Sequence, residues 1–433
     1  MSTRTTDLAA LWLAIAEAGG IDNYVQNQLV EHGFLVERRE TDTMSKAELK
    51  RYKAQLKREA AERRELRKAA WAAYRETHIV HLGDGVYYND AATMDRWDLD
   101  EPEARAAANE LPRLDGPDDL AKELGITVAQ LRWLAVHRDA ATRIHYTRFT
   151  IPKRDGSERA IWAPLPRLKA AQRWILRNVV EHLPVHGAAH GFLAGRSVVT
   201  NAAAHVGSKL IVNIDLKDFF PTITWRRARG MFRKAGYREQ VATLLAMICT
   251  EAPREVVEWE GQSYFVALGP RCLPQGAPTS PAITNTICLR LDRRLSGLAR
   301  RFGYTYTRYA DDLTFSLPLA HTGEPRVGAL IGAVGHIVRA EGFQVHPSKT
   351  RVQHTGRRQQ VTGLVVNGRE QPRVPRSLKR QLRAAVYNLR RGRPLPAGER
   401  FERLIGYAAW IHQAEPELGS ELLAALGGLN PTA

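Results

Sequence analysis

Three aspartates carry the pattern that most clearly indicates chemistry. Asp215 follows an apolar, β-branched run in KLIVNIDLKDFFPTI (209–223), which is typical of a buried strand. Asp311 and Asp312 lie together in YTYTRYADDLTFSL (304–317). A carboxylate beside a buried strand is costly unless it is paired or bound to a metal. The three acids therefore predict a metal site if the fold brings them together.

The metal expected there is magnesium. Clustered carboxylates repel one another and raise their own pKa values, and divalent cations remove that penalty. Oxygen-only ligands favour Mg²⁺, held together with substrate phosphates. Two such ions about 3.5–4 Å apart can activate an attacking hydroxyl and stabilise a departing pyrophosphate. The predicted reaction is nucleotidyl transfer.

The elements that position these acids can be read from the same segments. Apolar and hydroxyl side chains alternate after Asp312, which predicts two strands with Ala310-Asp311-Asp312 at their junction. Adjacent side chains on a regular strand diverge, so we expect Asp311 to be the closer ligand and Asp312 the more peripheral one. An Asp-Asp pair alone is usually a surface turn or helix cap, as expected for Asp118-Asp119.

Two further segments contain residues suited to binding nucleotides. In LPQGAPTSPAITN (273–285), Gly276 lets the backbone approach a ligand and Gln275 can hydrogen-bond along a nucleotide or template edge. Ser280 is expected to cap a helix that presents an apolar stripe, Ile283, Ile287, Leu291, Leu295 and Leu298. In FTIPKRDGSERAI (149–161), a turn separates Lys153 from Arg159, so two cations on paired strands could grip a triphosphate. A solvated basic hairpin is the alternative.

Taken in order, these motifs resemble those of reverse transcriptases, and of bacterial retron enzymes in particular. GFQVHPSK (342–349) and VTG (361–363) also match, and the resemblance covers about residues 120 to 410. It implies an α+β right-hand polymerase with an antiparallel palm sheet backed by helices. It also implies that two Mg²⁺ ions are bound at Asp215, Leu216, Asp311 and Asp312.

The resemblance assigns roles to further residues. Phe220 corresponds to the bulky side chain that excludes a nucleotide's 2′-hydroxyl, and Lys349 to a basic residue suspected of protonating the pyrophosphate, with a structural salt bridge equally open. Asn201 and His205 form NAxxH, a hallmark of retron enzymes, for which recognition of RNA or a structural role is expected.

A basic segment near the C-terminus is a candidate RNA contact. Residues 373–403 hold ten Arg/Lys against two Glu. As a helix, this segment would place an apolar stripe on one face and on another the candidate RNA-binding residues Arg376, Arg380, Arg383, Tyr387 and Arg390. A solvated helix is the alternative.

The resemblance implies an RNA-directed DNA polymerase that copies its cognate structured noncoding RNA into single-stranded DNA from dNTPs, primed from a 2′-hydroxyl of an internal guanosine. It also implies a role in phage defence with an effector protein. A group II intron-like or abortive-infection polymerase remains open. So does a scaffold with a decayed active site that holds RNA–DNA and restrains a toxin, although the intact acids argue against decay.

Composition agrees with a nucleic-acid partner. The 433 residues carry a net charge of +17, which favours binding to polyanions. Three cysteines without a CxxC pair exclude a disulfide framework and a four-thiolate zinc site, and they fit a cytoplasmic protein. The longest early apolar run, residues 8–16, is shorter than the roughly 20 residues of a membrane span, so no membrane role is expected.

The distribution of charge and of helix-breaking Pro and Gly residues suggests how the chain is divided into domains. Residues 46–75 carry eleven Lys/Arg against four Asp/Glu and no Gly or Pro, which predicts one long basic helix, either a solvated arm or a nucleic-acid contact. Residues 84–119 are acidic and contain Pro and Gly, which suggests a boundary there. We expect an N-terminal extension over 1–117, fingers over 118–208, palm over 209–370 and thumb over 371–433. The oligomeric state stays open.

Overall fold

The computed structural model describes residues 7–88, 98–152, 156, 158–368, 370–396 and 398–429. The chain divides into two compact units. The first comprises Met1–Tyr146, Pro164–Trp174 and Phe232–Pro270. The second comprises Thr147–Ala163, Ile175–Met231 and Arg271–Ala433.

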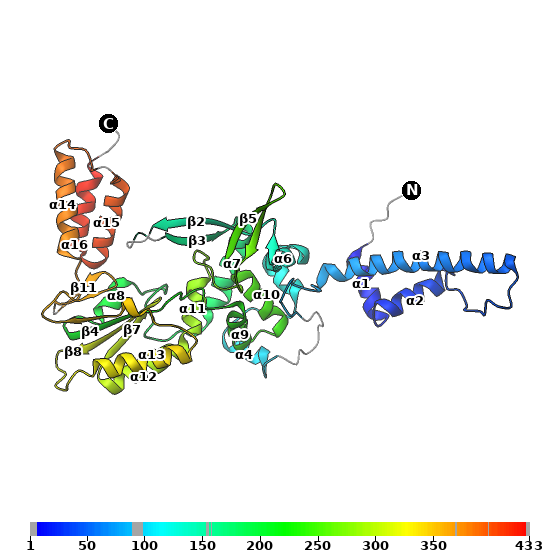
Figure 1. Ribbon diagram of the computed structural model, residues 1–433, viewed down its shortest axis with the longest axis horizontal. Helices are drawn as coiled ribbons and strands as arrows, with labels where there is room; N and C mark the ends of the chain where they lie inside the picture. Colours follow the sequence, from blue (N-terminus) through cyan, green and yellow to red (C-terminus); the bar gives the residue numbers. More distant parts are fainter. Residues whose placement is uncertain are drawn as a thin grey trace. The chain divides into compact units, whose positions relative to one another are not determined.

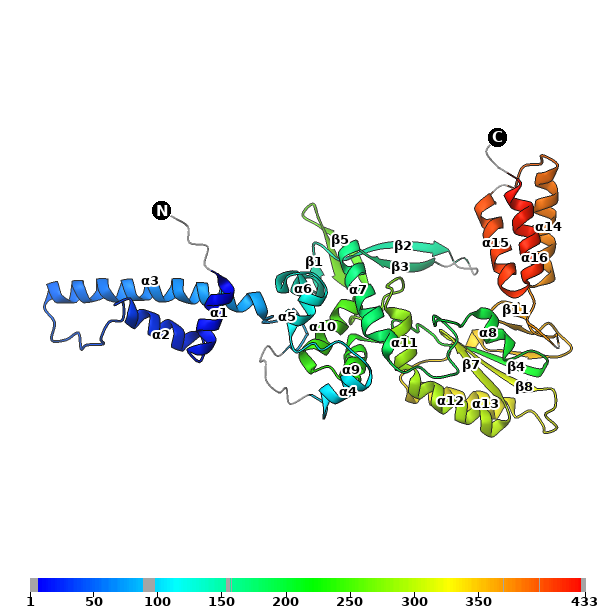
Figure 2. The ribbon, with the colours of Figure 1, turned by 180° about the vertical axis from the view of Figure 1, so that it is seen from behind.

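The first unit begins with a helical arm, formed by α1 (Leu8–Glu17), α2 (Ile21–Glu31) and α3 (Lys46–Thr77). The basic helix predicted over 46–75 is confirmed. Its start is fixed by a capping box in which the Ser45 hydroxyl accepts from the Glu48 N–H and the Glu48 carboxylate accepts from the Ser45 N–H. Both α1 and α2 pack against α3, along one side of it (Figures 1 and 2).

The rest of the first unit combines short helices with a small sheet. Its helices include α4 (Pro102–Ala108), α5 (Pro117–Glu123), α6 (Val128–Ala135) and α10 (Glu239–Cys249). Strands β1 (Ala140–Ala141), β5 (Arg254–Trp259) and β6 (Gln262–Ala267) form an antiparallel sheet in the order β1-β6-β5. Helices α5 and α6 flank Gly125, whose φ is +64°.

Some elements cross from one unit to the other. The hairpin strands β2 (Tyr146–Pro152) and β3 (Glu158–Pro164) pair as a two-stranded sheet that lies mostly in the second unit. The helices α7 (Pro166–Asn178) and α9 (Trp225–Ala235) each have residues in both units.

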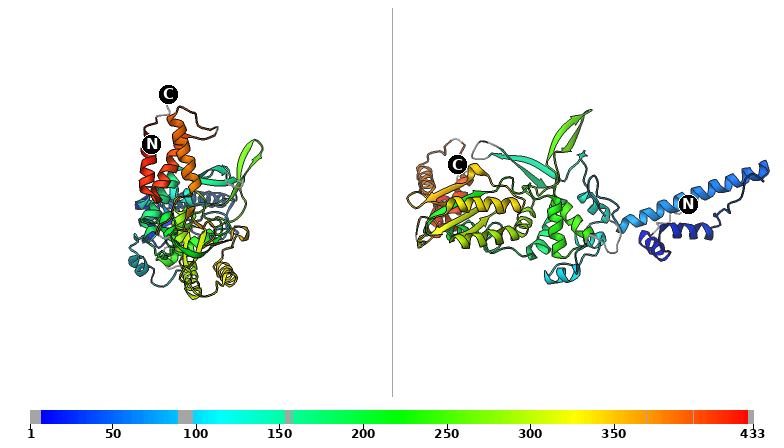
Figure 3. Two further views of the ribbon diagram at one scale, coloured as in Figure 1. Left: turned by 90° about the vertical axis from the view of Figure 1, so that its left-hand side faces the viewer. Right: turned by 60° about the horizontal axis from the view of Figure 1, so that its bottom comes forward.

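The second unit is built on a four-stranded antiparallel sheet in the order β7-β8-β4-β9. Its strands are β4 (Ser208–Asp215), β7 (Thr305–Tyr309), β8 (Asp312–Pro318) and β9 (Arg351–His354). Helix α12 (Leu289–Phe302) packs against β7 and against α13 (Val327–Ala340), and both helices lie beside the sheet (Figures 1 and 3). The predicted α+β class with an antiparallel sheet backed by helices is confirmed.

Shorter elements surround this sheet: η1 (Val180–His182), α8 (Val198–Ala203), α11 (Ser280–Ile287), η2 (Pro347–Lys349), β10 (Gln360–Val361) and β11 (Leu364–Val365). One long helix was expected from residue 280, but it is interrupted at Cys288, which separates α11 from α12. The predicted cap was wrong too. Thr279 holds the N-cap position, and the Ser280 hydroxyl instead donates to the Pro274 carbonyl at 2.8 Å.

The C-terminal part consists of α14 (Arg376–Arg390), α15 (Phe401–Ala414) and α16 (Pro416–Gly427). The predicted apolar stripe of α14 is confirmed, since Leu382 and Val386 are buried in a core shared with α15, α16 and the strands β10 and β11. Among the described residues, none of the helices combines the length and apolar character that crossing a membrane requires.

Candidate active site

The three predicted acids meet where β4 and β8 end. Asp215 is the last residue of β4 and Asp312 the first of β8, and the two are direct partners in the antiparallel register. Cross-strand partners point to the same face of a sheet, with Cβ atoms about 4.5–5.5 Å apart. Asp311 lies in the turn, and its carbonyl accepts from the Leu216 N–H at 3.0 Å. The predicted hairpin is confirmed.

The turn departs from regular strand geometry, as the argument from alternation required. Ala310 has φ of +55°, in the left-handed region that non-glycine residues seldom adopt. The register pairs Asp312 directly with Asp215, so Asp312 does not lie at the periphery of the three acids. Which of Asp311 and Asp312 is the closer metal ligand stays a prediction.

Burial and mutual repulsion disfavour the charged forms of Asp311 and Asp312. Loss of hydration, followed by repulsion from Asp311, raises the pKa of Asp312 to about 7. Part of the Asp312 side chain stays exposed, although the surrounding strands displace much of its hydration. Loss of hydration also raises the pKa of Asp311, and the nearby Asp215 charge adds to this.

Lys349 supplies the counter-charge in this conformation. Its Nζ lies 3.1 Å and 3.2 Å from the two oxygens of Asp215, whose side chain is only 14% exposed. The salt bridge weighed for Lys349 is therefore present. This does not exclude a catalytic role, because the ammonium group lies against the acid that is expected to bind metal.

The donors fit a hard cation, but they are not gathered around one. Within the described ranges, the side chains form no group of three or more His, Cys, Asp or Glu that could hold a metal ion as they stand. Three carboxylates at one strand end, two with raised pKa values, are the oxygen ligands that Mg²⁺ prefers. Binding would require the side chains to turn toward one another and Lys349 to release Asp215.

A pocket of about 930 Å³ opens over two of these acids. Asp215, Asp312 and Lys349 line it, together with Arg351, Arg357 and Arg358. Sequence reasoning missed these three arginines, although they follow GFQVHPSK closely in the chain. Their charges suit the phosphates of a nucleic acid or nucleotide.

A buried ion pair supports the hairpin that carries Asp311 and Asp312. Arg308, fully buried on β7, donates to both oxygens of Asp292 at 2.7–3.1 Å. It also donates to Asn285 Oδ1 at 3.0 Å and to the Ala310 carbonyl at 3.2 Å. One guanidinium therefore ties the strained turn to α11 and α12. Arg308 is the arginine of RYADD, so the sequence shows a cation beside the two acids, but only the fold shows that its partner is Asp292.

His205 of the NAxxH motif has a structural role in this conformation. Both His205 and Asn201 have no exposed surface, so neither side chain can touch RNA directly. His205 Nδ1 lies 2.7 Å from Ser316 Oγ and Nε2 2.7 Å from Thr307 Oγ1, so the ring links β7 to β8. Burial lowers the pKa of His205 to about 3, which keeps the ring neutral. In this conformation the structural alternative fits His205, and a role of the motif in RNA recognition stays a prediction.

The predicted nucleotide contacts are only partly placed. Lys153 lies outside the described residues. Arg159, on β3, is exposed, and its charge is one of the smaller influences that lower the pKa of Asp311, against the larger effect of burial. Phe220 is half-buried, with its ring centroid 5.7 Å from that of Phe219. The roles of these residues stay predictions.

The structure explains the glycine at position 276 by the approach of another strand, whereas the sequence suggested the approach of a ligand. Its φ is +124°, and an added Cβ would lie 2.6 Å from the Trp162 carbonyl oxygen. The neighbouring Gln275 carbonyl accepts from the Trp162 N–H at 2.7 Å. Gly276 is therefore required by the close approach of β3, whether or not a ligand also lies near.

The five candidate RNA-binding residues share α14. All five side chains are exposed: Arg376, Arg380, Arg383, Tyr387 and Arg390. The Arg391 guanidinium lies over the Tyr387 ring, 4.5 Å from its centroid. The predicted separation of a basic face from an apolar face is confirmed, and RNA contact itself stays a prediction.

Comparisons with known proteins agree with this site. Residues 151–374 match the family described as reverse transcriptase (RNA-dependent DNA polymerase). The chain is 54% identical over 430 residues to the Retron Mx162 reverse transcriptase of Myxococcus xanthus, covering 97% of this chain and 89% of that protein.

Two further relatives extend the likeness. The Retron Mx65 reverse transcriptase of the same organism is 45% identical over 328 residues, covering 75% of this chain and 74% of the relative. The Retron Ec86 reverse transcriptase of Escherichia coli is 30% identical over 321 residues, covering 74% and 91%. The chain therefore belongs to the bacterial retron reverse transcriptases and is an RNA-directed DNA polymerase.

Proposed function

We propose that this polymerase copies its own structured noncoding RNA into single-stranded DNA, with synthesis primed from a 2′-hydroxyl of that RNA. The observation that supports this most is the meeting of three acids where β4 and β8 end, two of which line a pocket with a basic wall. The likeness to retron enzymes supports the choice of RNA and of primer.

The second unit supplies most of a right-hand polymerase in this proposal. The palm covers 209–370 with the antiparallel sheet, the thumb covers 371–433 with α14 to α16, and the fingers cover 118–208. Residues 1–117 form an N-terminal extension outside these three parts. An effector protein in phage defence is one proposed partner.

Two Mg²⁺ ions would be held by Asp215, Asp311 and Asp312, with the Leu216 position beside them. When bound, they would activate the attacking hydroxyl and stabilise the leaving pyrophosphate. The chain's own groups do the remaining work. Arg308 holds the turn that carries Asp311, and Lys349, freed from Asp215, would be available to donate a proton to the pyrophosphate.

Around the metals, Lys153 and Arg159 would bind the triphosphate, Phe220 would exclude a 2′-hydroxyl, and Gln275 would bind along the nucleotide. On the thumb, the exposed arginines of α14 would bind phosphates of the RNA, with Tyr387 available for base stacking.

The experiment is to purify the protein, sequence the nucleic acid that copurifies with it, and measure DNA synthesis on a primed RNA with and without Mg²⁺. We expect a branched RNA–DNA product of one sequence and Mg²⁺-dependent synthesis. An unbranched product on a spliced intron RNA would favour the group II intron-like alternative. Absence of any synthesis would favour the scaffold.

A further inference from the structure

The exposed face of α3 carries a line of cations that no part of the polymerase chemistry uses. At 3.6 residues per turn, six of the cations between residues 46 and 68 fall within an arc of about 60° and extend along about 33 Å of the helix. We call this the α3 cation stripe, and it comprises Lys46, Lys50, Lys53, Lys57, Arg64 and Lys68, all exposed.

The opposite face of α3 is the packed one. Ala70 and Ala73 are fully buried there with Ile15 of α1, and Glu59 is 2% exposed. Figure 1 shows α1 and α2 on this side only. The stripe is thus the side of α3 that the arm leaves uncovered.

Charge is distributed unequally between the two faces. On the packed side, Glu59 accepts from Arg38 at 2.9 Å and from Arg63 at 2.7 Å, and Asp22 pairs with Arg67 at 2.7 Å. On the stripe, among the residues that the structure describes, only Lys68 has an ion pair, at 3.9 Å to Glu65. The ion pairs of the arm thus lie mostly on its packed side, and among the described residues they leave five of the six stripe cations without an ion pair.

A helix whose charges served only solubility would be built differently. Opposite charges at i and i+4 stabilise a helix, whereas like charges there destabilise it. The stripe instead places Lys46 with Lys50, Lys53 with Lys57, and Arg64 with Lys68 at that spacing. The helix therefore keeps repulsive pairs along one line.

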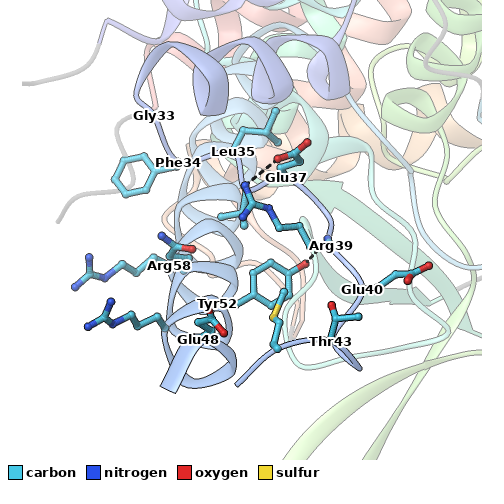
Figure 4. A pocket seen from close by; sticks show the side chains of 14 residues that line it. Gly33, Phe34, Leu35, Glu37, Arg39, Glu40, Thr43, Glu48, Tyr52 and Arg58 are labelled. Atoms are coloured by element: carbon cyan, nitrogen blue, oxygen red, sulfur yellow. Dashed lines mark hydrogen bonds and ion pairs between the residues drawn. The ribbon is translucent and has the colours of Figure 1, made fainter. Parts of the chain in front are cut away.

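A pocket on the other side of the arm is lined by both acidic and basic side chains. It encloses about 790 Å³ between the 33–44 loop and α3 (Figure 4). Three glutamates and three arginines lie in its wall: Glu37, Glu40, Glu48, Arg39, Arg51 and Arg58. Such balanced charge gives no preference for a polyanion, in contrast to the stripe.

We infer that the α3 cation stripe binds the phosphate backbone of a double-helical segment of nucleic acid. A duplex carries one charge per strand about every 3.4 Å, so about 33 Å of helix faces more phosphates than the stripe has cations. Flexible lysines dominate the stripe, which suits binding without sequence readout. The inference rests on the proposed function, since it extends contact with the RNA to the arm.

The test compares two variants of the full-length chain with equal charge change. Lys53→Glu/Lys57→Glu alters the stripe, and Arg51→Glu/Arg58→Glu alters exposed cations of the same helix outside it. The probe is an unrelated RNA hairpin of about 20 base pairs, which is longer than the roughly 16 base pairs that a double-stranded-RNA-binding domain spans. Affinity is measured over a range of salt concentrations, and circular dichroism confirms that both variants keep their helices.

Each lost phosphate contact lowers the slope of log affinity against log salt by about 0.9, as for duplex DNA. We expect the stripe variant to lose about 1.8 in slope, hence about 10- to 100-fold in affinity at 0.1 M salt. The control variant should lose less than about threefold, given that it removes no specific phosphate contact.

Three results would overturn the inference: equal losses in both variants, no loss in the stripe variant, or a stripe variant that loses binding to phosphatidylserine vesicles or polyglutamate while keeping the hairpin. DNA synthesis by the unmodified protein is measured separately. Its absence would refute the proposed function, whereas an unchanged slope with synthesis intact would refute only the stripe.

Discussion

Replacing Arg308 by methionine should destabilise the protein strongly. Asp292 has no exposed surface, and the substitution removes the cation that pairs with it. Among the residues that the structure describes, the Tyr306 hydroxyl is then the one side-chain donor left to the Asp292 carboxylate. Removing one partner of a buried ion pair costs about 3–5 kcal/mol, because an uncompensated charge remains in the interior. We expect a loss of that size in the free energy of unfolding.

The double substitution Arg308→Met/Asp292→Leu separates two roles of the pair. Replacing both partners by apolar groups is often close to neutral, so most of the lost stability should return. DNA synthesis should not return with it, because the Ala310 carbonyl in the strained turn still lacks the donor that lies at 3.2 Å in the native chain.

The assay is urea unfolding followed by circular dichroism, with DNA synthesis measured well below each unfolding midpoint. Arg300→Met, at an exposed position on α12, is the matched control and should change stability by less than about 0.5 kcal/mol. The reasoning is refuted if Arg308→Met behaves like this control, or if the double variant regains activity together with stability.

Three further predictions concern the site. The pKa of Asp312 rises from its ordinary value of 3.8 to about 7 in the folded chain, so the metal-free protein should lose stability as pH rises from about 4 to about 7. Asp312→Asn should flatten that decline in thermal melts, and an unchanged decline would contradict the stated cause. Phe220→Ala should increase ribonucleotide incorporation in single-nucleotide extension, and unchanged discrimination would disprove the steric role. His205→Phe should lower the free energy of unfolding by about 1–3 kcal/mol, since it leaves the Ser316 and Thr307 hydroxyls without their partner. The folded variant should bind RNA with unchanged affinity. A loss of RNA affinity without a loss of stability would instead support a recognition role for His205.

Local patterns in the sequence predicted local structure well. Alternation after Asp312 predicted β8, and the composition of residues 46–75 predicted α3. The stripe of Leu382 and Val386 predicted the packing of α14. In each case the information lies within a few turns or strand residues, where periodicity reports which face is buried.

What the sequence could not supply depends on distant neighbours. His205 reads as a candidate RNA contact until Thr307 and Ser316 are seen to hold it, more than a hundred positions away. Gly276 suggests an approaching ligand, whereas its close neighbour is the backbone of Trp162. The break of the helix at Cys288 also had no local signal, since no Pro or Gly marks it.

The most direct test of the central claim is DNA synthesis by Asp311→Asn compared with Asp118→Asn, which alters the exposed Asp-Asp pair on α5. Each variant removes one charge from an aspartate pair, and both are assayed on the same primed RNA with Mg²⁺. The account predicts that Asp311→Asn abolishes synthesis while Asp118→Asn retains it. Synthesis by Asp311→Asn at the rate of the unmodified protein would contradict the account.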